Sequence, residues 1–230
     1  KKGGCDLFVV STNKEKQTIV ENFEYEPDEV INTGLPRWDV LKDKSQGKRE
    51  ILIMPTWRNW LDSVPDKDFE ESDYFRHYMG LLNSERLNQI LEKYDLEVNF
   101  YLHAKFQEYA DTFKSISKRI HLISFGEVAV NEMLMRCRML ITDYSSVCWD
   151  ILYQDKPSLF YQFDIEKYNE AHGSYIDMET ELFGDRAATQ EQLLDYLEEA
   201  VQNDFHLKPE YEKMRGEYLQ FKDHEHSRHI

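Results

Sequence analysis

Short apolar segments alternate with longer segments of mixed polarity along most of the chain. Apolar runs rich in β-forming residues predict strands at 6–11, 30–33, 50–55, 98–103, 119–123, 139–142 and 158–161. Apolar residues at helical spacing predict helices at 12–23, 74–94, 106–113, 128–137, 145–153 and 190–201. Regular alternation of strands and helices is typical of a doubly wound parallel sheet. The pattern therefore predicts an α/β fold of the Rossmann-like kind.

The same pattern divides the chain into a small and a large part. The first two strands and the helix between them form a β-α-β unit that ends near residue 38, and such a unit is too small to close a core alone. Residues 39–47 are mostly charged or small, which indicates a linker. Residues 48–230 carry the remaining strands and are expected to form the main domain.

Composition and charge exclude several classes of function. The 28 Lys and Arg residues against 44 Asp and Glu give a net charge of −16, which argues against nucleic acid as a ligand. The 41% of hydrophobic residues suffices for a core, and no apolar run approaches the roughly 18 residues that span a bilayer. Cys5, Cys137 and Cys148 are too widely spaced for a zinc motif, so we expect a reducing, cytoplasmic compartment. Any phosphate site must be local.

Open parallel sheets bind ligands beyond the carboxyl ends of their strands, and one such end is rich in hydroxyl groups. The strand 139–142 runs through Thr142, Asp143, Tyr144, Ser145 and Ser146 into a helix. The helix N-terminus and these hydroxyls could bind a phosphate without net positive charge. The same residues would also be expected if Asp143 or Ser145 only capped the helix. Neither a Walker A loop nor a Gly-x-Gly-x-x-Gly loop is present.

Two further strand ends carry a charged or titratable side chain. Arg58 follows the strand 50–55 and could make a bidentate phosphate contact, or it could be a solvated loop residue. His103 ends the strand 98–103 and could donate a hydrogen bond to a phosphate or transfer a proton, or it could be structural. Each feature alone leaves both interpretations open.

Taken together and in order, these segments resemble the CDP-glycerol glycerophosphotransferase family, the bacterial teichoic-acid polymerases and primases. The resemblance is carried by 34–39 (Gly-Leu-Pro-Arg-Trp-Asp), 55–58 (Pro-Thr-Trp-Arg), His103, and 140–146 (Leu-Ile-Thr-Asp-Tyr-Ser-Ser) continued to Tyr161. It covers essentially the whole chain and implies a GT-B architecture, with two Rossmann-like lobes facing an active site. On this basis, 1–38 would end the N-terminal lobe, 39–47 would be the linker, and 48–230 would be the nucleotide-binding C-terminal lobe.

The resemblance also implies residue roles and a reaction. It implies that the phosphates of CDP lie among the hydroxyls of Thr142, Ser145 and Ser146, and that Asp143 fixes the turn. Arg58 and the catalytic His103 would contact the same phosphates. Asp150 would be a supporting or ribose-side carboxylate. The implied reaction transfers glycerol phosphate from CDP-glycerol to a polyol-phosphate polymer of the cell wall or capsule, without a further cofactor. The enzyme would act in the cytoplasm, with the full-length protein at the inner face of the membrane.

Departures from the family pattern shape this expectation. The Trp-His-Gly segment that carries the family's other characteristic histidine is absent from the 230 residues, so the chain resembles a donor-binding lobe without its acceptor base. Arg138 stands where the family is usually acidic, Ala104 follows His103, and no Pro precedes Gly184. The donor could therefore be CDP-ribitol or another CDP-alcohol. A nucleotide-sugar-dependent GT-B glycosyltransferase and a non-catalytic nucleotide-binding module remain alternatives.

The C-terminal segment 223–229 (Asp-His-Glu-His-Ser-Arg-His) brings histidines and carboxylates close in sequence. The spacing of His224 and His226 is not a helical ligand spacing, and a fourth ligand is not evident. We expect a frayed, polar helix end here and predict no metal site.

Overall fold

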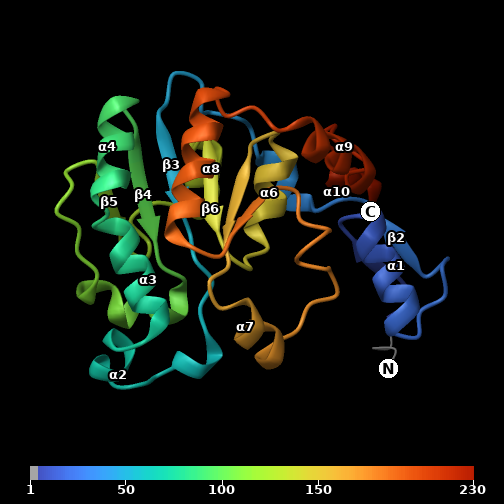
Figure 1. The fold of residues 1–230 in the computed structure, drawn as a ribbon. Helices are drawn as coiled ribbons and strands as arrows, with labels where there is room; N and C mark the ends of the chain where they lie inside the picture. The colour runs from blue at the N-terminus through green and yellow to red at the C-terminus, as the bar shows by residue number, and fades with distance from the viewer. Residues whose placement is uncertain (1–4) are drawn as a thin grey trace.

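The structure, a computed structural model, describes residues 5–230, and its main part is a parallel sheet of six strands (Figure 1). The strand order is β5-β4-β3-β6-β7-β8. The strands are β3 (Glu50–Ile53), β4 (Glu97–Tyr101), β5 (Ile120–Ile123), β6 (Met139–Thr142), β7 (Ser158–Tyr161) and β8 (Asp185–Ala187). The predicted α/β fold with a parallel sheet is therefore confirmed.

Helices cover both faces of this sheet and give it two cores. One face packs against α3 (Asp73–Leu82), α4 (Glu85–Lys93) and α8 (Gln190–Gln202), and the other against α5 (Val130–Arg136) and α6 (Val147–Tyr153). Successive strand residues point to opposite faces, so Ile51 and Ile53 lie in the first core and Leu52 in the second. This burial on both faces explains why the strands read as unbroken apolar runs.

Shorter elements connect or extend these layers. They are η1 (Pro36–Val40), η2 (Asn59–Leu61), α2 (Asp66–Glu70), η3 (Ala104–Thr112), α7 (Ile165–Ala171), α9 (Pro209–Tyr218) and α10 (His226–His229). Within residues 5–230, no helix is long and apolar enough to cross a membrane.

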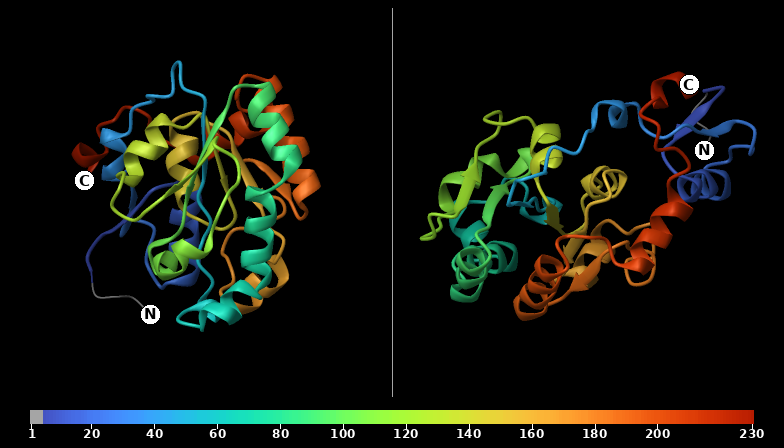
Figure 2. Two further views of the ribbon diagram at one scale, coloured as in Figure 1. Left: turned by 90° about the vertical axis from the view of Figure 1, so that its left-hand side faces the viewer. Right: turned by 90° about the horizontal axis from the view of Figure 1, so that it is seen from above.

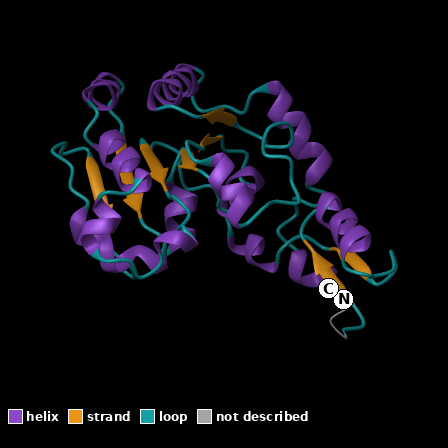
Figure 3. Cartoon of the chain, turned by 60° about the horizontal axis from the view of Figure 1, so that its bottom comes forward, coloured by secondary structure: helices purple, strands orange, loops and turns teal. Residues whose placement is uncertain are grey.

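The N-terminal residues form a separate small unit. It consists of β1 (Phe8–Val10), α1 (Asn13–Asn22) and β2 (Val30–Asn32), and its two strands pair in parallel with each other and not with the large sheet. The last helices, α9 and α10, return to this unit, so the first and last described elements lie side by side (Figures 1, 2 and 3). The small unit is thereby connected to the sheet domain by the chain that follows β2 and by contacts with the C-terminal helices.

Gly34 shows how closely the C-terminal segment packs on the connection between the two parts. Its φ of +71° lies in the left-handed region, and a Cβ built on it would lie 2.1 Å from Nδ1 of His226. Only glycine satisfies both conditions without a shift of the surrounding atoms.

The structure differs from the sequence prediction at several helices. The predicted helix 74–94 is two helices, because α3 ends at Leu82 and the hydroxyl of Ser84 caps α4 by accepting from the Leu87 N–H at 3.2 Å. The segment 106–113 belongs to the 3-10 helix η3. The elements α2, α7, β8 and α9 were not predicted, since each is short or carries a weak apolar pattern.

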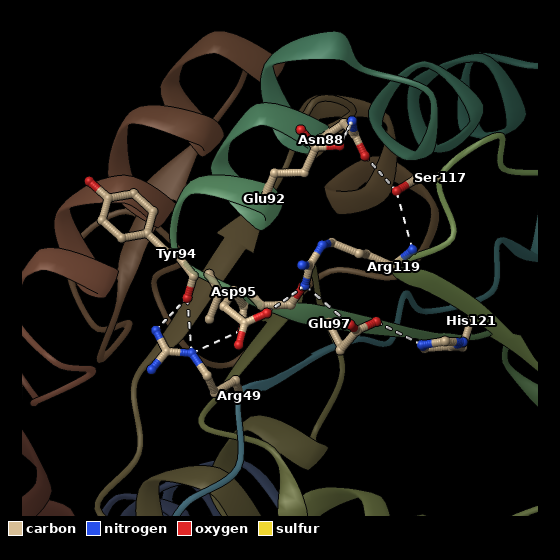
Figure 4. Close-up of polar contacts among 10 residues, drawn as sticks. Arg49, Asn88, Glu92, Tyr94, Asp95, Glu97, Ser117, Arg119 and His121 are labelled. Carbon is tan, nitrogen blue, oxygen red and sulfur yellow. Dashed lines mark hydrogen bonds and ion pairs between the residues drawn. The ribbon is translucent and has the colours of Figure 1, made fainter.

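The amino ends of β4 and β5 are joined by a polar network (Figure 4). Arg49 donates from Nε to the carbonyl oxygens of Tyr94 and Asp95, both at 2.9 Å, and Arg119 pairs with the carboxylates of Asp95 and Glu97 at 3.0 and 3.2 Å. These arginines are thus bound to groups of the chain itself, and the contacts stabilise the turns at this edge. The candidate functional residues lie at the opposite edge.

Candidate active site

The strand order places a crevice between β3 and β6. From β3 the chain continues outward to β4 and β5, whereas from β6 it continues in the other direction to β7 and β8. Open α/β sheets bind ligands at such a topological switch point, beyond the carboxyl ends of the strands. The segments 54–58 and 142–146, singled out in the sequence, follow these two neighbouring strands, so the structure brings them together.

Asp143 joins the two segments. Its Oδ1 accepts hydrogen bonds from the backbone N–H groups of Thr56 at 2.8 Å and Tyr144 at 2.7 Å. Its Oδ2 lies 2.8 Å from Nη2 of Arg58 and accepts from the Tyr78 hydroxyl at 3.2 Å. The carboxylate is fully buried, so it holds the loop after β3 against the turn after β6.

Arg58 is equally buried and its guanidinium is saturated with acceptors. Nε and Nη2 donate to the two oxygens of Asp164 at 2.7 and 3.1 Å, and Nη1 donates to the Thr56 carbonyl at 2.7 Å. Burial disfavours the cation, but Asp143 and Asp164 outweigh this effect and raise the pKa of Arg58 well above its ordinary value. The exposed fraction of Arg58 is 0%, so in this arrangement its guanidinium does not face a cleft, and the expected phosphate contact stays a prediction that this arrangement does not support.

Thr142 and Asp150 also have partners within the chain. The Thr142 hydroxyl is buried and donates to the Met54 carbonyl at 2.7 Å, which links β6 to β3. Asp150 accepts from Nε of Arg37 at 2.7 Å and from the indole N–H of Trp38 at 2.9 Å. The contact of Asp150 with Arg37 is compatible with the supporting role expected as one of its two alternatives, and the phosphate contact expected of Thr142 stays a prediction. Both side chains position the strands and the connection to the small unit.

Ser145 and Ser146 are the hydroxyls of this turn that remain accessible. Ser145 is half-buried, and its Oγ has a single weak contact, with the Val147 N–H at 3.5 Å. Ser146 is exposed and makes no side-chain cap of α6. A ligand at the switch point can therefore reach both hydroxyls, which can donate to phosphate oxygens.

His103 follows β4, the strand on the other side of β3 from the turn that carries these serines. Its Nδ1 accepts from the Lys105 backbone N–H at 3.2 Å, so the neutral ring carries its proton on Nε2. Burial and the Lys105 ammonium lower the pKa of His103 below its ordinary value, with Asp143 opposing them. The ring stacks on Trp57, with centroids 6.2 Å apart. At neutral pH, His103 is thus a neutral hydrogen-bond donor through Nε2.

A cleft of about 420 Å³ lies between the small N-terminal unit and the start of α6. Ser146 and Trp149 line one wall, Thr12 and Lys14 line the other, and Arg37 joins them. Lys14 forms an ion pair of 2.5 Å with Glu181, so the cation on this wall is neutralised by the loop before β8. The cleft combines apolar wall, hydroxyls and paired cations, which suits a polar phosphorylated ligand.

Arg37 and Lys14 were not predicted as site residues. Arg37 stands in the segment 34–39, which reads as a turn because of its Gly and Pro, and Lys14 is one of many charged helix residues. The sequence carries no signal that brings them to Ser146, because the contact depends on how the small unit sits on α6.

The C-terminal histidines are more ordered than expected. His226 is buried, with Nδ1 2.8 Å from the Thr33 carbonyl and Nε2 3.0 Å from the Tyr153 hydroxyl, so the expectation of a frayed end is wrong. Asp223, His226 and His229 have ligand-type atoms within 4.8 Å of one another. Both nitrogens of His226 make hydrogen bonds within the chain, and Nε2 of His229 lies 3.1 Å from Oδ2 of Asp223.

Solved structures share this fold. The wall teichoic acid polymerase TagF superposes with a TM-score of 0.74 at 20% identity, over 98% of this chain and 56% of that one. A putative UDP-N-acetylglucosamine 2-epimerase from Listeria monocytogenes superposes with a TM-score of 0.58 at 18% identity, over 97% of this chain and 57% of that one. At these identities the likeness shows the GT-B-like fold alone.

Relatives by sequence are closer. The minor teichoic acid biosynthesis protein GgaB of Bacillus subtilis (strain 168) is 30% identical over 231 residues, covering 94% of this chain and 25% of GgaB. A teichoic acid glycerol-phosphate transferase of Staphylococcus aureus (strain NCTC 8325 / PS 47) is 27% identical, covering 84% of this chain and 51% of that protein. The chain thus spans between a quarter and about half of these relatives. A family profile matches residues 1–230 and confirms the resemblance seen in the sequence: the chain belongs to the CDP-glycerol:poly(glycerophosphate) glycerophosphotransferase family.

Proposed function

We propose that this chain is the donor-binding part of a glycerophosphotransferase, which binds CDP-glycerol or a related CDP-alcohol and serves transfer of the polyol phosphate to a teichoic-acid-type polymer. The observation that carries the proposal is the position of Ser145 and Ser146 in the turn after β6, at the switch point of the sheet, with Ser146 lining the 420 Å³ cleft and His103 following β4 on the other side of β3. In this proposal residues 1–38 end an N-terminal lobe, 39–47 are the linker, and 48–230 are the nucleotide-binding lobe. The separate pairing of β1 with β2 supports that division.

In the proposed transfer reaction the chain would supply hydrogen-bond donors, because the nucleophile is the hydroxyl group of the acceptor. An acceptor hydroxyl oxygen would attack the phosphorus that bears glycerol, and the bond from that phosphorus to the CMP oxygen would break. CMP leaves with the electron pair, so donors aimed at its phosphate stabilise the transition state. Nε2–H of His103 and the hydroxyls of Ser145 and Ser146 are such donors. The base that takes the acceptor proton would come from the part of the longer enzyme that corresponds to the N-terminal lobe.

Nucleotide binding tests this proposal directly. The chain is titrated with CDP-glycerol, CMP and UDP, and its melting temperature is followed. A ligand at about 100 times its Kd stabilises by about 2.7 kcal/mol, which corresponds to a shift of about 5–10 °C for a chain of this size. We expect the shift with CDP-glycerol and a smaller one with CMP.

A pair of variants locates the site. Ser145→Ala/Ser146→Ala should abolish most of the shift without lowering the melting temperature of the free chain, since neither hydroxyl makes a strong internal bond. Ser124→Ala, an exposed serine after β5, is the matched control and should keep the full shift. Stabilisation by UDP but not by cytidine nucleotides would favour a nucleotide-sugar enzyme. No response to any nucleotide would favour a non-catalytic module.

A further inference from the structure

At the carboxyl edge of the sheet, a lysine ammonium lies over the indole ring of each of two tryptophans. Nζ of Lys105 lies 4.8 Å from the ring centroid of Trp57, and Nζ of Lys167 lies 4.8 Å from that of Trp60. His172 lies between the tryptophans, with its ring centroid 6.3 Å from that of Trp57 and 6.4 Å from that of Trp60. Lys105, Lys167 and His172 are exposed, and the tryptophans are half-buried. We call these five residues the Trp–Lys surface.

The Trp–Lys surface is assembled from three distant segments. The tryptophans belong to the loop after β3 and to η2, Lys105 belongs to η3, and Lys167 and His172 belong to α7 and its C-cap. Figure 1 shows α7 and the segment between β3 and α2 on the same lower side of the molecule. The surface is therefore a tertiary arrangement and not a run of charges along one helix.

This surface is fixed rigidly to the turn that carries the serines. Tyr168, between Lys167 and His172 in sequence, stacks on Tyr144 with ring centroids 3.6 Å apart. Asp164, at the N-cap of α7, holds the buried Arg58. The position of α7 is therefore set by the same buried contacts that set the turn after β6, so a ligand on the Trp–Lys surface lies beside the switch point.

The charges of the surface are available to an anionic ligand to different degrees. Lys105 pairs with Asp62 at 3.1 Å, but both side chains are well exposed, so the pair is weak and can exchange for another anion. Lys167 forms no ion pair with a residue in the described part of the chain, and its ammonium lies over the Trp60 ring. Such a pair of ammonium groups stands out in a chain with a net charge of −16.

We propose that the Trp–Lys surface binds the phosphodiester-linked polyol chain to which the transferase adds its unit; this rests on the function proposed above. The ammonium groups and His172 would contact phosphodiester oxygens, while the indole rings would hold the ammonium groups in position. His103 stacks on Trp57, so it connects this surface with the donor. A nucleic acid would meet the same cations, but the net charge of −16 argues against a nucleic acid as the ligand.

The test uses the 230-residue chain and a short fluorophore-labelled oligo(glycerol phosphate), with Kd measured by fluorescence anisotropy at several salt concentrations. The variant Lys105→Gln/Lys167→Gln removes two exposed ammonium groups, and Lys48→Gln/Lys213→Gln, equal in charge change, is its control. Counterion release predicts that losing two contacts flattens the slope of log Kd against log salt by about 1.4 and weakens binding at least about tenfold at ~50 mM salt. Trp60→Leu should weaken binding while leaving the salt slope unchanged.

Each outcome decides the proposal. Weaker binding in the Lys105/Lys167 variant, with the control pair and the CDP-glycerol melting shift unaffected, supports it. No binding by the unaltered chain, or equal loss in the control pair, overturns it. Equally tight, equally lysine-dependent binding of single-stranded oligo(dT) also overturns it, because the surface would then be a general polyanion site. If CDP-glycerol gives no shift but the oligomer still binds through these lysines, the donor proposal fails and this one stands.

Discussion

Replacing Arg58 by methionine separates a structural role of this residue from the ligand contact that its sequence context suggested. In the structure its guanidinium lies between Asp143, which is fully buried, and Asp164, and the carbonyl of Thr56 accepts from it as well. Arg58→Met keeps an unbranched apolar side chain of similar length but leaves two carboxylates without their cation.

The expected magnitude follows from these partners. Removing one member of a buried pair costs about 3–5 kcal/mol, because the remaining charge stays desolvated. Asp143 keeps three other donors and Asp164 is partly accessible, with 12% of its side chain exposed, so we expect the lower half of this range. At 2–4 °C per kcal/mol this is a fall in melting temperature of about 6–16 °C. Arg58→Lys keeps the charge but loses the fork geometry, and should lose about half as much.

Urea and thermal unfolding, followed by circular dichroism, measure both variants against Arg76→Met. Among residues 5–230, Arg76 forms an ion pair with the exposed Asp73 alone, so its loss should change stability by less than about 0.5 kcal/mol. The reasoning is refuted if Arg58→Met melts within about 1 °C of the unaltered chain yet loses the CDP-glycerol shift. That result would mean that the guanidinium acts on the ligand and not on the fold.

Three further predictions test other parts of the site. The pKa of the His103 imidazole should lie below 6.5 in an NMR pH series and should rise in Lys105→Gln. Because the folded-state pKa is the lower one, the contribution of the neutral ring to stability is lost as the pH falls through this region. A pKa at or above 6.5 would contradict the inferred burial. Gly34→Ala should lower the free energy of unfolding in urea by about 2 kcal/mol or more, because φ is positive and the new Cβ meets His226. The double variant Gly34→Ala/His226→Ala should recover only the part of this loss that is due to the clash with His226. Additive effects of the two substitutions would contradict this contact. Lys156→Met should lower the free energy of unfolding by about 2–4 kcal/mol, since the buried ammonium donates to two backbone carbonyls, and should leave nucleotide affinity unchanged. A loss of nucleotide affinity at unchanged stability would instead place Lys156 in the binding site.

The sequence predicts the sheet well because its strands are buried on both faces. The run 139–142 is apolar at all positions but the last, and an apolar run of this kind is buried on both faces only in the middle of the sheet. Helix breaks are harder to predict, as between α3 and α4, where apolar residues continue on both sides and one serine cap decides the boundary. The location of the crevice follows from the strand ends, which are readable once the strands are known.

Side-chain roles at the crevice could not be predicted in the same way. Arg58 and Asp164 are 106 positions apart, and Arg37 and Asp150 are 113 apart, so nothing local shows that each cation already has a carboxylate. A strand-end arginine in an acidic chain reads as a ligand contact until its partner is known. Burial and pairing are tertiary properties, and in this chain they give Arg58, Thr142 and Asp150 partners that the sequence did not show.

The pairing of these cations changes how an acidic chain would hold a nucleotide. Around the proposed donor site Arg58 is neutralised by two carboxylates, Arg37 by Asp150 and Lys14 by Glu181, so the donors proposed for the nucleotide are neutral: two hydroxyls and the Nε2–H of His103. Neutral donors release few counterions, so CDP-glycerol affinity should change little with salt, whereas polymer binding at Lys105 and Lys167 should weaken steeply. Measuring both affinities on one preparation across ~50–500 mM salt tests this division. A donor affinity that falls as steeply as polymer binding would show that free cations hold the pyrophosphate, against the pairing seen here.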